Sequence, residues 1–95
     1  MSPTVVRETV GGEPYEYFPL GRYVVSAPRV CRGRPTFKYT RIEVSGVLDW
    51  LGAGNSLEEL VTRYEGKVPR EAIQEAATLA AEALVRESAA AAGSK

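Results

Sequence analysis

The stretch that decides the fold is residues 43–80, EVSGVLDWLGAGNSLEELVTRYEGKVPREAIQEAATLA. In its first half, apolar residues recur twice at i, i+3, i+4 and i+7, the spacing that lines one face of an α-helix. The two sets are Val44, Val47, Leu48 and Leu51, then Leu57, Leu60, Val61 and Tyr64. We therefore predict two short helices, each with one face buried.

Glycine and capping residues mark the ends of these two helices. Gly52 and Gly54 supply a stop for the first, because glycine accepts the left-handed conformation that is common where helices end. Ser56 and Glu59 have the spacing of a capping box, in which each side chain binds a free backbone N–H at the helix start. Gly66 is then expected to end the second helix.

A third helix is predicted from Pro69 to about Ser88. Proline fits the first turn of a helix, and no glycine or proline interrupts the alanine-rich run that follows. The predicted apolar stripe consists of Ile73, Ala76, Ala77, Ala80 and Leu84. At about 1.5 Å per residue this helix is roughly 30 Å long, so we expect its far end to extend past the first two helices and contact something else.

The N-terminal residues 1–25 are predicted to form a β-hairpin or small meander. Short strand-like segments alternate with turn signals. The segments are 5–6, 15–18 and 23–25, and the turns are Gly11-Gly12 and Pro19-Leu20-Gly21. Because an isolated hairpin is marginal in water, this β element must lie against the helices or pair with a second subunit.

A chain of 95 residues suits a single domain with one modest core. We divide it into the β element at 1–25, a basic loop at 26–42, a three-helix core at 43–88 and a flexible tail at 89–95. The hydrophobic share of 44% and charged share of 25% are ordinary for a globular protein. No apolar run approaches the roughly 20 residues that cross a bilayer, and no signal pattern is present, so we expect a cytoplasmic protein without a membrane partner.

The residue inventory argues against catalysis. The chain has no histidine, which removes the usual general base near neutral pH and the usual partner of a serine or cysteine nucleophile. Cys31 is the only cysteine, so neither an internal disulfide nor a zinc ligand set is expected. Cys31 lies among arginines, but without a base we favour a packing role over a catalytic one. We predict no enzyme, no metal site and no cofactor.

The net charge of zero hides a strong asymmetry. Residues 22–41 hold six basic residues and no acidic one, whereas residues 42–88 hold four basic and nine acidic residues. Pro28, Gly33 and Pro35 break any regular element, so we expect a loop that carries its cations outward, with Gly33 and Pro35 in structural roles. Such asymmetry bears on partners rather than on fold. The loop faces either a polyanion or the acidic half of its own assembly.

Two loop residues have alternative interpretations. Phe37 lies beside Lys38, a combination suited to base stacking and phosphate contact, but Phe37 also suits a core anchor for the loop. For Arg41 we expect a structural role, bracing the loop through an ion pair with Glu43 or Asp49, and the alternative is direct contact with a ligand.

Two helices joined by a glycine-containing turn, with a preceding helix to complete the core, form the layout of a trihelical helix-turn-helix domain. In that layout the N-terminal turns of the last helix enter the major groove of DNA. These turns also carry Glu71 and Glu75, which repel phosphate. We predict base or backbone contacts from Lys67, Arg70 and Gln74, and phosphate contacts from Arg29, Arg32, Arg34 and Lys38.

Several motifs resemble the bacterial and archaeal family known as domain of unknown function 433. They are Tyr23, the Gly33-x-Pro35 loop, the Thr40-Arg41-Ile42 triplet, Ala53-Gly54 and Glu58-Glu59. They fall in order over about two thirds of the chain. One departure is Tyr39, because the family usually has glycine just before the triplet.

The resemblance implies a homeodomain-like helical domain with an N-terminal β element, acting as the antitoxin of a toxin–antitoxin pair. The implied protein partner is a PIN-like ribonuclease toxin, and such antitoxins typically bind DNA at their own promoter as homodimers. The residues also support an alternative, a protein-interaction module without DNA binding. In that case the basic loop meets an acidic surface, and the alanine-rich helix, whose small side chains permit close helix approach, docks a partner.

Overall fold

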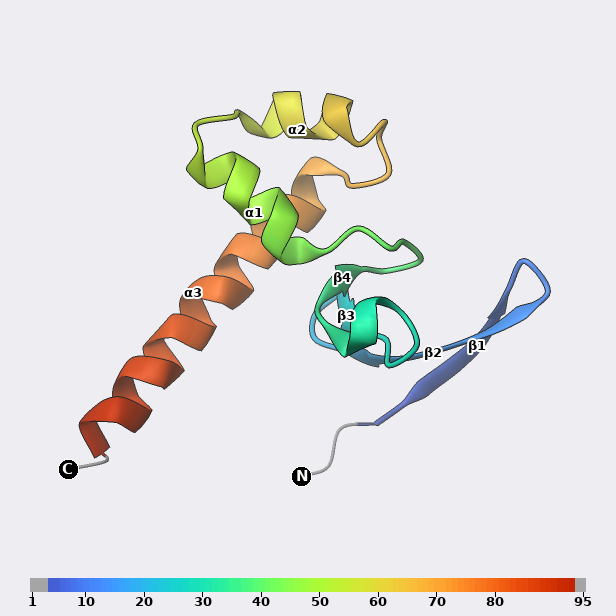
Figure 1. The fold of residues 1–95 in the computed structure, drawn as a ribbon, viewed down its shortest axis with the longest axis horizontal. Coiled ribbons are helices and arrows are strands. Elements are labelled where there is room, and N and C mark those ends of the chain that lie inside the picture. The colour runs from blue at the N-terminus through green and yellow to red at the C-terminus, as the bar shows by residue number, and fades with distance from the viewer. Residues whose placement is uncertain (1–3, 94–95) are drawn as a thin grey trace.

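The computed structural model describes residues 4–93, in which four strands precede three helices (Figure 1). The strands are β1 (Val6–Val10), β2 (Glu13–Pro19), β3 (Val24–Ser26) and β4 (Thr36–Phe37). A short 3-10 helix, η1 (Cys31–Gly33), separates β3 from β4, and α1 (Val44–Gly52), α2 (Leu57–Arg63) and α3 (Arg70–Gly93) follow. The predicted class, mainly helical with a small N-terminal β element, is confirmed.

The strands form one antiparallel meander in the order β1-β2-β3-β4. Gly11 and Gly12 connect β1 to β2 with φ of 58° and 82°, as a two-residue hairpin turn requires. β4 was not predicted, because its two residues lie inside the irregular stretch assigned to the basic loop. It exists because Val24 pairs with Phe37 and Val25 with Thr36, contacts between segments that the sequence does not mark as partners.

The core lies between the sheet and the helices. In β3, Val24 packs into the main cluster with the helices, and Val25 packs with Tyr17 and Ala27 in a second, smaller cluster. The buried members of the main cluster are Val24, Phe37, Val44, Val47, Leu60, Val68, Ala72, Ile73 and Ala76. Phe37 is only 2% exposed, so it is a core anchor and not a base-stacking residue.

The helix boundaries follow the predicted signals except at the C-terminal end. Ser56 and Glu59 form the expected capping box at the start of α2, and Gly66 follows α2 with φ of 76°. The tail predicted as flexible at 89–95 is helical as far as Gly93, because alanine, which dominates it, is the best helix former. Ser94 and Lys95 lie outside the described residues.

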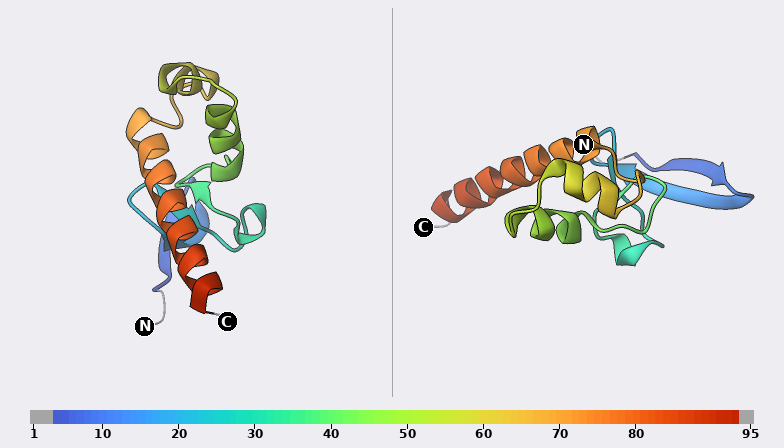
Figure 2. Two further views of the ribbon diagram at one scale, coloured as in Figure 1. Left: turned by 90° about the vertical axis from the view of Figure 1, so that its left-hand side faces the viewer. Right: turned by 90° about the horizontal axis from the view of Figure 1, so that it is seen from above.

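Two parts of the molecule project from the packed centre. The β1–β2 hairpin and the second half of α3 extend in opposite directions (Figure 2). The radius of gyration of 14.7 Å exceeds the value of about 12 Å typical of a globular chain of this length. The helical core therefore covers only the first half of α3.

Candidate nucleic-acid interface

Backbone geometry fixes the loop that carries the arginines. Cys31, Arg32 and Gly33 all have positive φ, which turns the chain sharply at η1. The Ser26 hydroxyl donates a hydrogen bond of 2.6 Å to the Gly33 carbonyl and holds this turn against β3. The Pro35 carbonyl accepts from the Val44 N–H at 3.0 Å, which ties the end of the loop to the start of α1.

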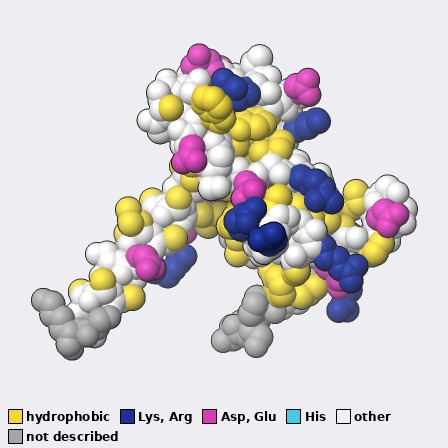
Figure 3. Space-filling model, viewed as in Figure 1, with side chains coloured by type: hydrophobic (Ala, Val, Ile, Leu, Met, Phe, Trp, Pro, Cys, Tyr) yellow, Lys and Arg dark blue, Asp and Glu magenta, His cyan; other side chains and the backbone are white. Residues whose placement is uncertain are grey.

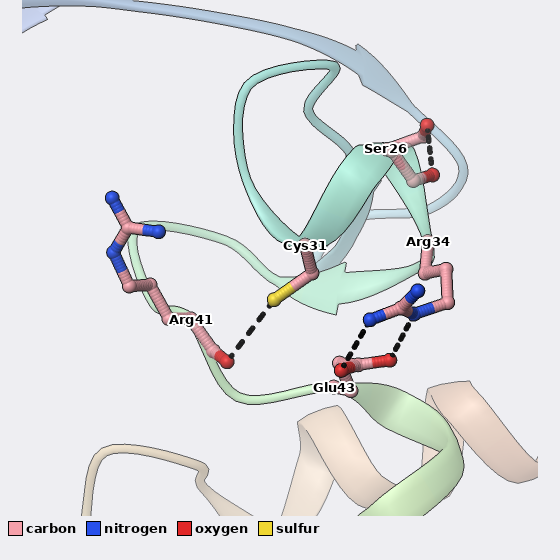
Figure 4. Close-up of polar contacts among 6 residues, drawn as sticks. Ser26, Cys31, Arg34, Arg41 and Glu43 are labelled. Carbon is pink, nitrogen blue, oxygen red and sulfur yellow. Dashed lines mark hydrogen bonds and ion pairs between the residues drawn. The ribbon is translucent and has the colours of Figure 1, made fainter.

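Arg34 is engaged within the molecule. Its guanidinium donates two hydrogen bonds to the Glu43 carboxylate, from Nε to Oε1 at 2.6 Å and from Nη2 to Oε2 at 3.2 Å (Figure 4). The pair lowers the pKa of Glu43 and raises that of Arg34. Arg34 therefore joins the loop to the first turn of α1, and a phosphate would have to displace Glu43 to reach it.

Arg41 does not form the ion pair predicted from the sequence. Because Arg34 occupies Glu43, Arg41 forms no ion pair with Glu43 or Asp49, and its side chain points away from Glu43 in Figure 4. Its backbone carbonyl accepts a contact of 3.5 Å from the Cys31 thiol. The Arg41 backbone thus braces the loop, while its guanidinium is exposed.

Lys38 and Tyr39 lie where the loop meets the β1–β2 hairpin. The Lys38 ammonium lies 5.0 Å from the centroid of the Tyr17 ring and 5.2 Å from that of Tyr39. A hydrogen bond with Tyr17 raises the pKa of Lys38, which keeps the ammonium charged. Tyr39 donates its N–H to the Tyr15 hydroxyl at 3.0 Å and its own hydroxyl to Glu8 at 2.9 Å.

Three adjoining hollows bring cations from distant parts of the chain onto one surface. Arg22, Lys38 and Lys67 line the first, beside the start of α3. The second shares Tyr39 with the first and includes Arg41. The third shares Arg41 and Tyr15 with the second and includes Arg29. We call these five cations, Arg22, Arg29, Lys38, Arg41 and Lys67, the basic track.

Acidic residues lie beside the track at several points: Glu65 is 4.0 Å from Lys67, Glu75 accepts the Arg22 backbone N–H, and Glu8 accepts the Tyr39 hydroxyl. Glu13 lines the second hollow and Glu16 the third. The Glu16 carboxylate is held by Arg7 at 2.5 Å, which, with a smaller contribution from Arg29, lowers the pKa of Glu16. In Figure 3, dark blue side chains gather over the middle of the face, where the loop between β3 and α1 lies.

The start of α3 presents a mixed surface. Arg70 lies 2.9 Å from Glu58 of α2, and Lys67 lies 4.0 Å from Glu65. Gln74 is exposed. Glu75 points to the sheet instead, where its carboxylate accepts backbone N–H groups before and in β3. Glu75 is therefore a structural residue and is not available to contact bases.

The predicted contact residues thus fall into three groups. Lys38 and Lys67 meet in one hollow, and Arg29 lies at the other end of the track. Arg34 and Arg70 are paired with glutamates, whereas Arg32 and Gln74 are exposed outside the hollows. Sequence reasoning did not single out Arg22, which lines the first hollow, although it opens the acid-free segment 22–41.

Residues 4–93 contain neither a cluster of metal ligands nor a membrane-spanning helix. Nowhere in this range do three or more cysteine, aspartate or glutamate side chains gather as metal ligands would. Within the same range, no helix combines the length and the apolar character needed to span a bilayer.

Comparison with known proteins identifies a family. Searches among curated proteins and among solved structures gave no match. The family described as Protein of unknown function (DUF433) matches residues 24–80, from β3 to the middle of α3. Because this match spans more than half of the chain and covers the Gly33-x-Pro35 and Thr40-Arg41-Ile42 motifs, the protein belongs to the DUF433 family.

Proposed function

We propose that the protein is the antitoxin of a toxin–antitoxin pair, a dimeric DNA-binding autoregulator that also neutralises a PIN-like ribonuclease. The observation that carries the DNA-binding part is the basic track. Among the described residues, Arg22, Arg29, Lys38 and Arg41 form no ion pair, and Lys67 reaches Glu65 only at 4.0 Å. Arg22, Arg29, Arg41 and Lys67 are exposed and Lys38 is half-buried, and accessible cations without a close ion pair are suited to phosphate contacts.

The arrangement of α2 and α3 supports the same proposal. A short turn containing Gly66 joins the two helices, and α1 completes their core, as in a helix-turn-helix domain. In this proposal the first turns of α3 enter the major groove with Arg70 and Gln74 toward base edges. Lys67 lies at the junction of this helix start and the track, so groove and phosphate contacts would be continuous.

The test is a gel-shift titration with the DNA upstream of the protein's own gene, repeated over a salt series. Binding should weaken steeply with salt, because each phosphate contact adds about 0.9 to the slope of log K against log salt. Lys38→Ala and Arg41→Ala should each reduce that slope by about this amount. Arg86→Ala removes the same charge from the far part of α3 and serves as the control. Salt-independent binding, or none, would refute the DNA-binding role.

The neutralising role is tested separately. The Arg29 and Arg32 side chains are exposed on the loop and suit the acidic metal site of a ribonuclease, where they would block substrate phosphate. Adding the purified chain to the product of the neighbouring gene should inhibit ribonuclease activity, and an Arg29→Ala, Arg32→Ala double variant should inhibit less. Full inhibition by the double variant would place the contact elsewhere.

One observation favours the alternative of a protein-interaction module without DNA binding. Leu84 and Val85 on α3 are 71% and 69% exposed, an apolar surface with no role in contacting DNA. This alternative predicts that the neighbouring gene product co-purifies with Arg70→Ala and Gln74→Ala variants as well as with the original chain, and that no DNA is shifted.

A further inference from the structure

Tyrosine side chains lie between the cations of the basic track. Tyr23 and Tyr39 line the first hollow, Tyr39 and Tyr15 line the second, and Tyr15 lines the third. Tyr39 is 54% exposed, more than any other aromatic side chain in residues 4–93, whereas Tyr15 and Tyr23 are half-buried. Each hollow therefore combines at least one aromatic ring with at least one cation.

Two of these rings lie directly beside a cation of the track. The guanidinium carbon of Arg22 is 5.5 Å from the centroid of the Tyr23 ring, and the Lys38 ammonium is 5.2 Å from that of Tyr39. The Lys38 N–H donates to the Tyr23 carbonyl at 2.7 Å, which joins the two pairs. The first hollow thus holds positive charge and aromatic surface side by side at two points.

Tyr39 is fixed before any ligand binds. Its N–H and hydroxyl are bonded to Tyr15 and Glu8, and its ring centroid lies 5.5 Å from that of Tyr15. Its backbone is left-handed, with φ of 67°, so a side chain is kept here at a cost in stability. Residues held in such conformations cluster at functional sites. We therefore looked for a ligand that uses the Tyr39 ring.

The first hollow suits a negatively charged group best. Its volume is about 370 Å³, and none of its lining residues in the described part of the chain is acidic. Glu65 comes within 4.0 Å of Lys67 but does not line the hollow. Glu13 and Glu16 line the second and third hollows. A phosphate should therefore bind most strongly in the first.

Aromatic rings among cations suit a nucleic acid whose bases are free. In a duplex the bases are paired and stacked on one another, so side chains that follow the backbone reach phosphates and sugars but cannot stack on a base. In a single strand the bases stack on aromatic side chains while cations follow the phosphates. The interleaved rings and cations of the track match a single strand better than a duplex.

Another exposed ring with a cation beside it lacks this setting. Trp50 of α1 is 42% exposed, and the Arg63 guanidinium lies 4.0 Å from the centroid of its ring. Arg63, however, lines a hollow together with Glu58 and Glu59, whose carboxylates repel phosphate. Trp50 therefore provides a matched control for Tyr39.

We propose that the basic track binds single-stranded nucleic acid, with a phosphate among the cations of the first hollow and a base stacked on Tyr39. The inference shares the track with the proposed function but does not require duplex binding. A single strand and the upstream duplex would compete for the same cations, so a free strand would displace the protein from its own promoter.

The ligand class is tested by the fluorescence anisotropy of a labelled oligo-dT strand of about 12 nucleotides. An oligo-U strand of the same length is the second arm and shows which sugar is preferred. Affinity should fall with salt by about 0.7 in the slope of log K against log salt for each phosphate contact. A strand of abasic nucleotides keeps the phosphates and lacks the bases, so it should bind about fivefold more weakly or worse.

The role of the ring is tested by two substitutions at one position. Tyr39→Gly suits the left-handed backbone and removes the ring, so it should weaken oligo-dT binding by about fivefold or more. Tyr39→Phe keeps the ring and should bind like the original chain. Trp50→Ala removes the exposed ring outside the track and should leave binding unchanged. Circular dichroism and thermal denaturation show whether each variant is folded.

A second pair of variants separates this inference from the proposed function. An Arg70→Ala, Gln74→Ala double variant should lose the upstream duplex and keep oligo-dT, because these residues lie at the start of α3 outside the hollows. Tyr39→Gly should keep the duplex and lose oligo-dT. Failure of the duplex shift alone would refute the autoregulator and leave single-strand binding in place.

Three results would overturn the inference. One is the absence of binding to both oligo-dT and oligo-U at low salt. Another is equal affinity for the abasic strand, which would make the track a surface for phosphates only. The third is a folded Tyr39→Gly variant that binds as tightly as Tyr39→Phe, which would show that the ring makes no contact.

Discussion

The carboxylate of Glu75 on α3 accepts a hydrogen bond of 2.7 Å from the backbone N–H of Tyr23, 52 residues earlier in the chain. The same carboxylate accepts the N–H groups of Arg22 at 2.8 Å and Val24 at 3.0 Å. One side chain thus holds the turn before β3 against α3. This contact joins the sheet to the helices and places Arg22 beside the start of α3.

Glu75→Ala should lower the free energy of unfolding by about 2–3 kcal/mol, because backbone donors at a partly buried site lose a charged acceptor. Urea denaturation at neutral pH measures the effect. Glu71→Ala, an exposed neighbour on the same helix, is the control and should stay within about 0.5 kcal/mol of the original chain. Equal effects from the two variants would contradict the role given to Glu75.

Tyr39 occupies a left-handed backbone conformation with φ of 67°, where a side chain costs roughly 1–2 kcal/mol. Tyr39→Gly relieves this cost and keeps the backbone N–H bond to Tyr15, but it loses the ring contact with Tyr15 and the hydroxyl bond to Glu8, so we expect a net change of under about 1 kcal/mol. Tyr39→Val loses the same contacts and keeps a β-branched residue at positive φ, so it should be less stable than Tyr39→Gly by about 1–2 kcal/mol. Thermal denaturation compares the two, and equal midpoints would argue against the left-handed geometry.

Thr36 is fully buried, and its hydroxyl finds no hydrogen-bond partner among the described residues. Thr36→Val keeps the shape and removes the unsatisfied group, so it should raise the free energy of unfolding by about 1 kcal/mol. Thr40→Val is the matched control. The Thr40 hydroxyl donates to Phe37 O and accepts from Ile42 N–H, so its loss should destabilise. A destabilised Thr36→Val variant would indicate a partner for the Thr36 hydroxyl.

The ion pair of Arg34 and Glu43 predicts a pH dependence. The guanidinium lowers the pKa of Glu43 below its ordinary 4.5. A carboxylate with a lower pKa in the folded state stabilises the fold above its unfolded pKa, and that stabilisation is lost as the pH falls through the folded pKa. Stability should therefore drop below about pH 4.5, and Arg34→Met should make the drop shallower. Urea midpoints measured from pH 7 down to pH 3 test this, and parallel profiles would contradict it.

Local signals predicted the helices, and tertiary contacts determined what the sequence missed. The apolar spacing and the Ser56–Glu59 capping box act within a few residues, so α1, α2 and the start of α3 could be read directly. β4 consists of two residues whose partner, β3, lies about a dozen residues earlier, and no local pattern announces such a pair.

In the candidate site, too, the sequence indicates the local features, whereas tertiary contacts decide which side chains pair. The acid-free segment 22–41 shows where the cations gather along the sequence, but not which of them form ion pairs in the fold. Arg34 and Arg41 are equivalent by composition, and each could pair with Glu43. The turn at η1 sends Arg34 to that carboxylate and leaves the Arg41 guanidinium exposed. The pairing of Arg70 with Glu58 likewise depends on how α3 packs beside α2.

The ion pair between Arg70 and Glu58 should limit the affinity for DNA. In the proposed complex Arg70 must leave Glu58 to reach a base edge, and an exposed ion pair of this kind is worth about 0–1 kcal/mol. Glu58→Gln should therefore tighten binding to the upstream DNA by up to about fivefold, since 1 kcal/mol corresponds to that ratio. Glu82→Gln makes the same change in net charge on the far part of α3 and should have a smaller effect. In an Arg70→Ala background the gain from Glu58→Gln should shrink to that of Glu82→Gln. A full gain in that background would mean that Glu58 acts on the DNA directly and that Arg70 makes no contact.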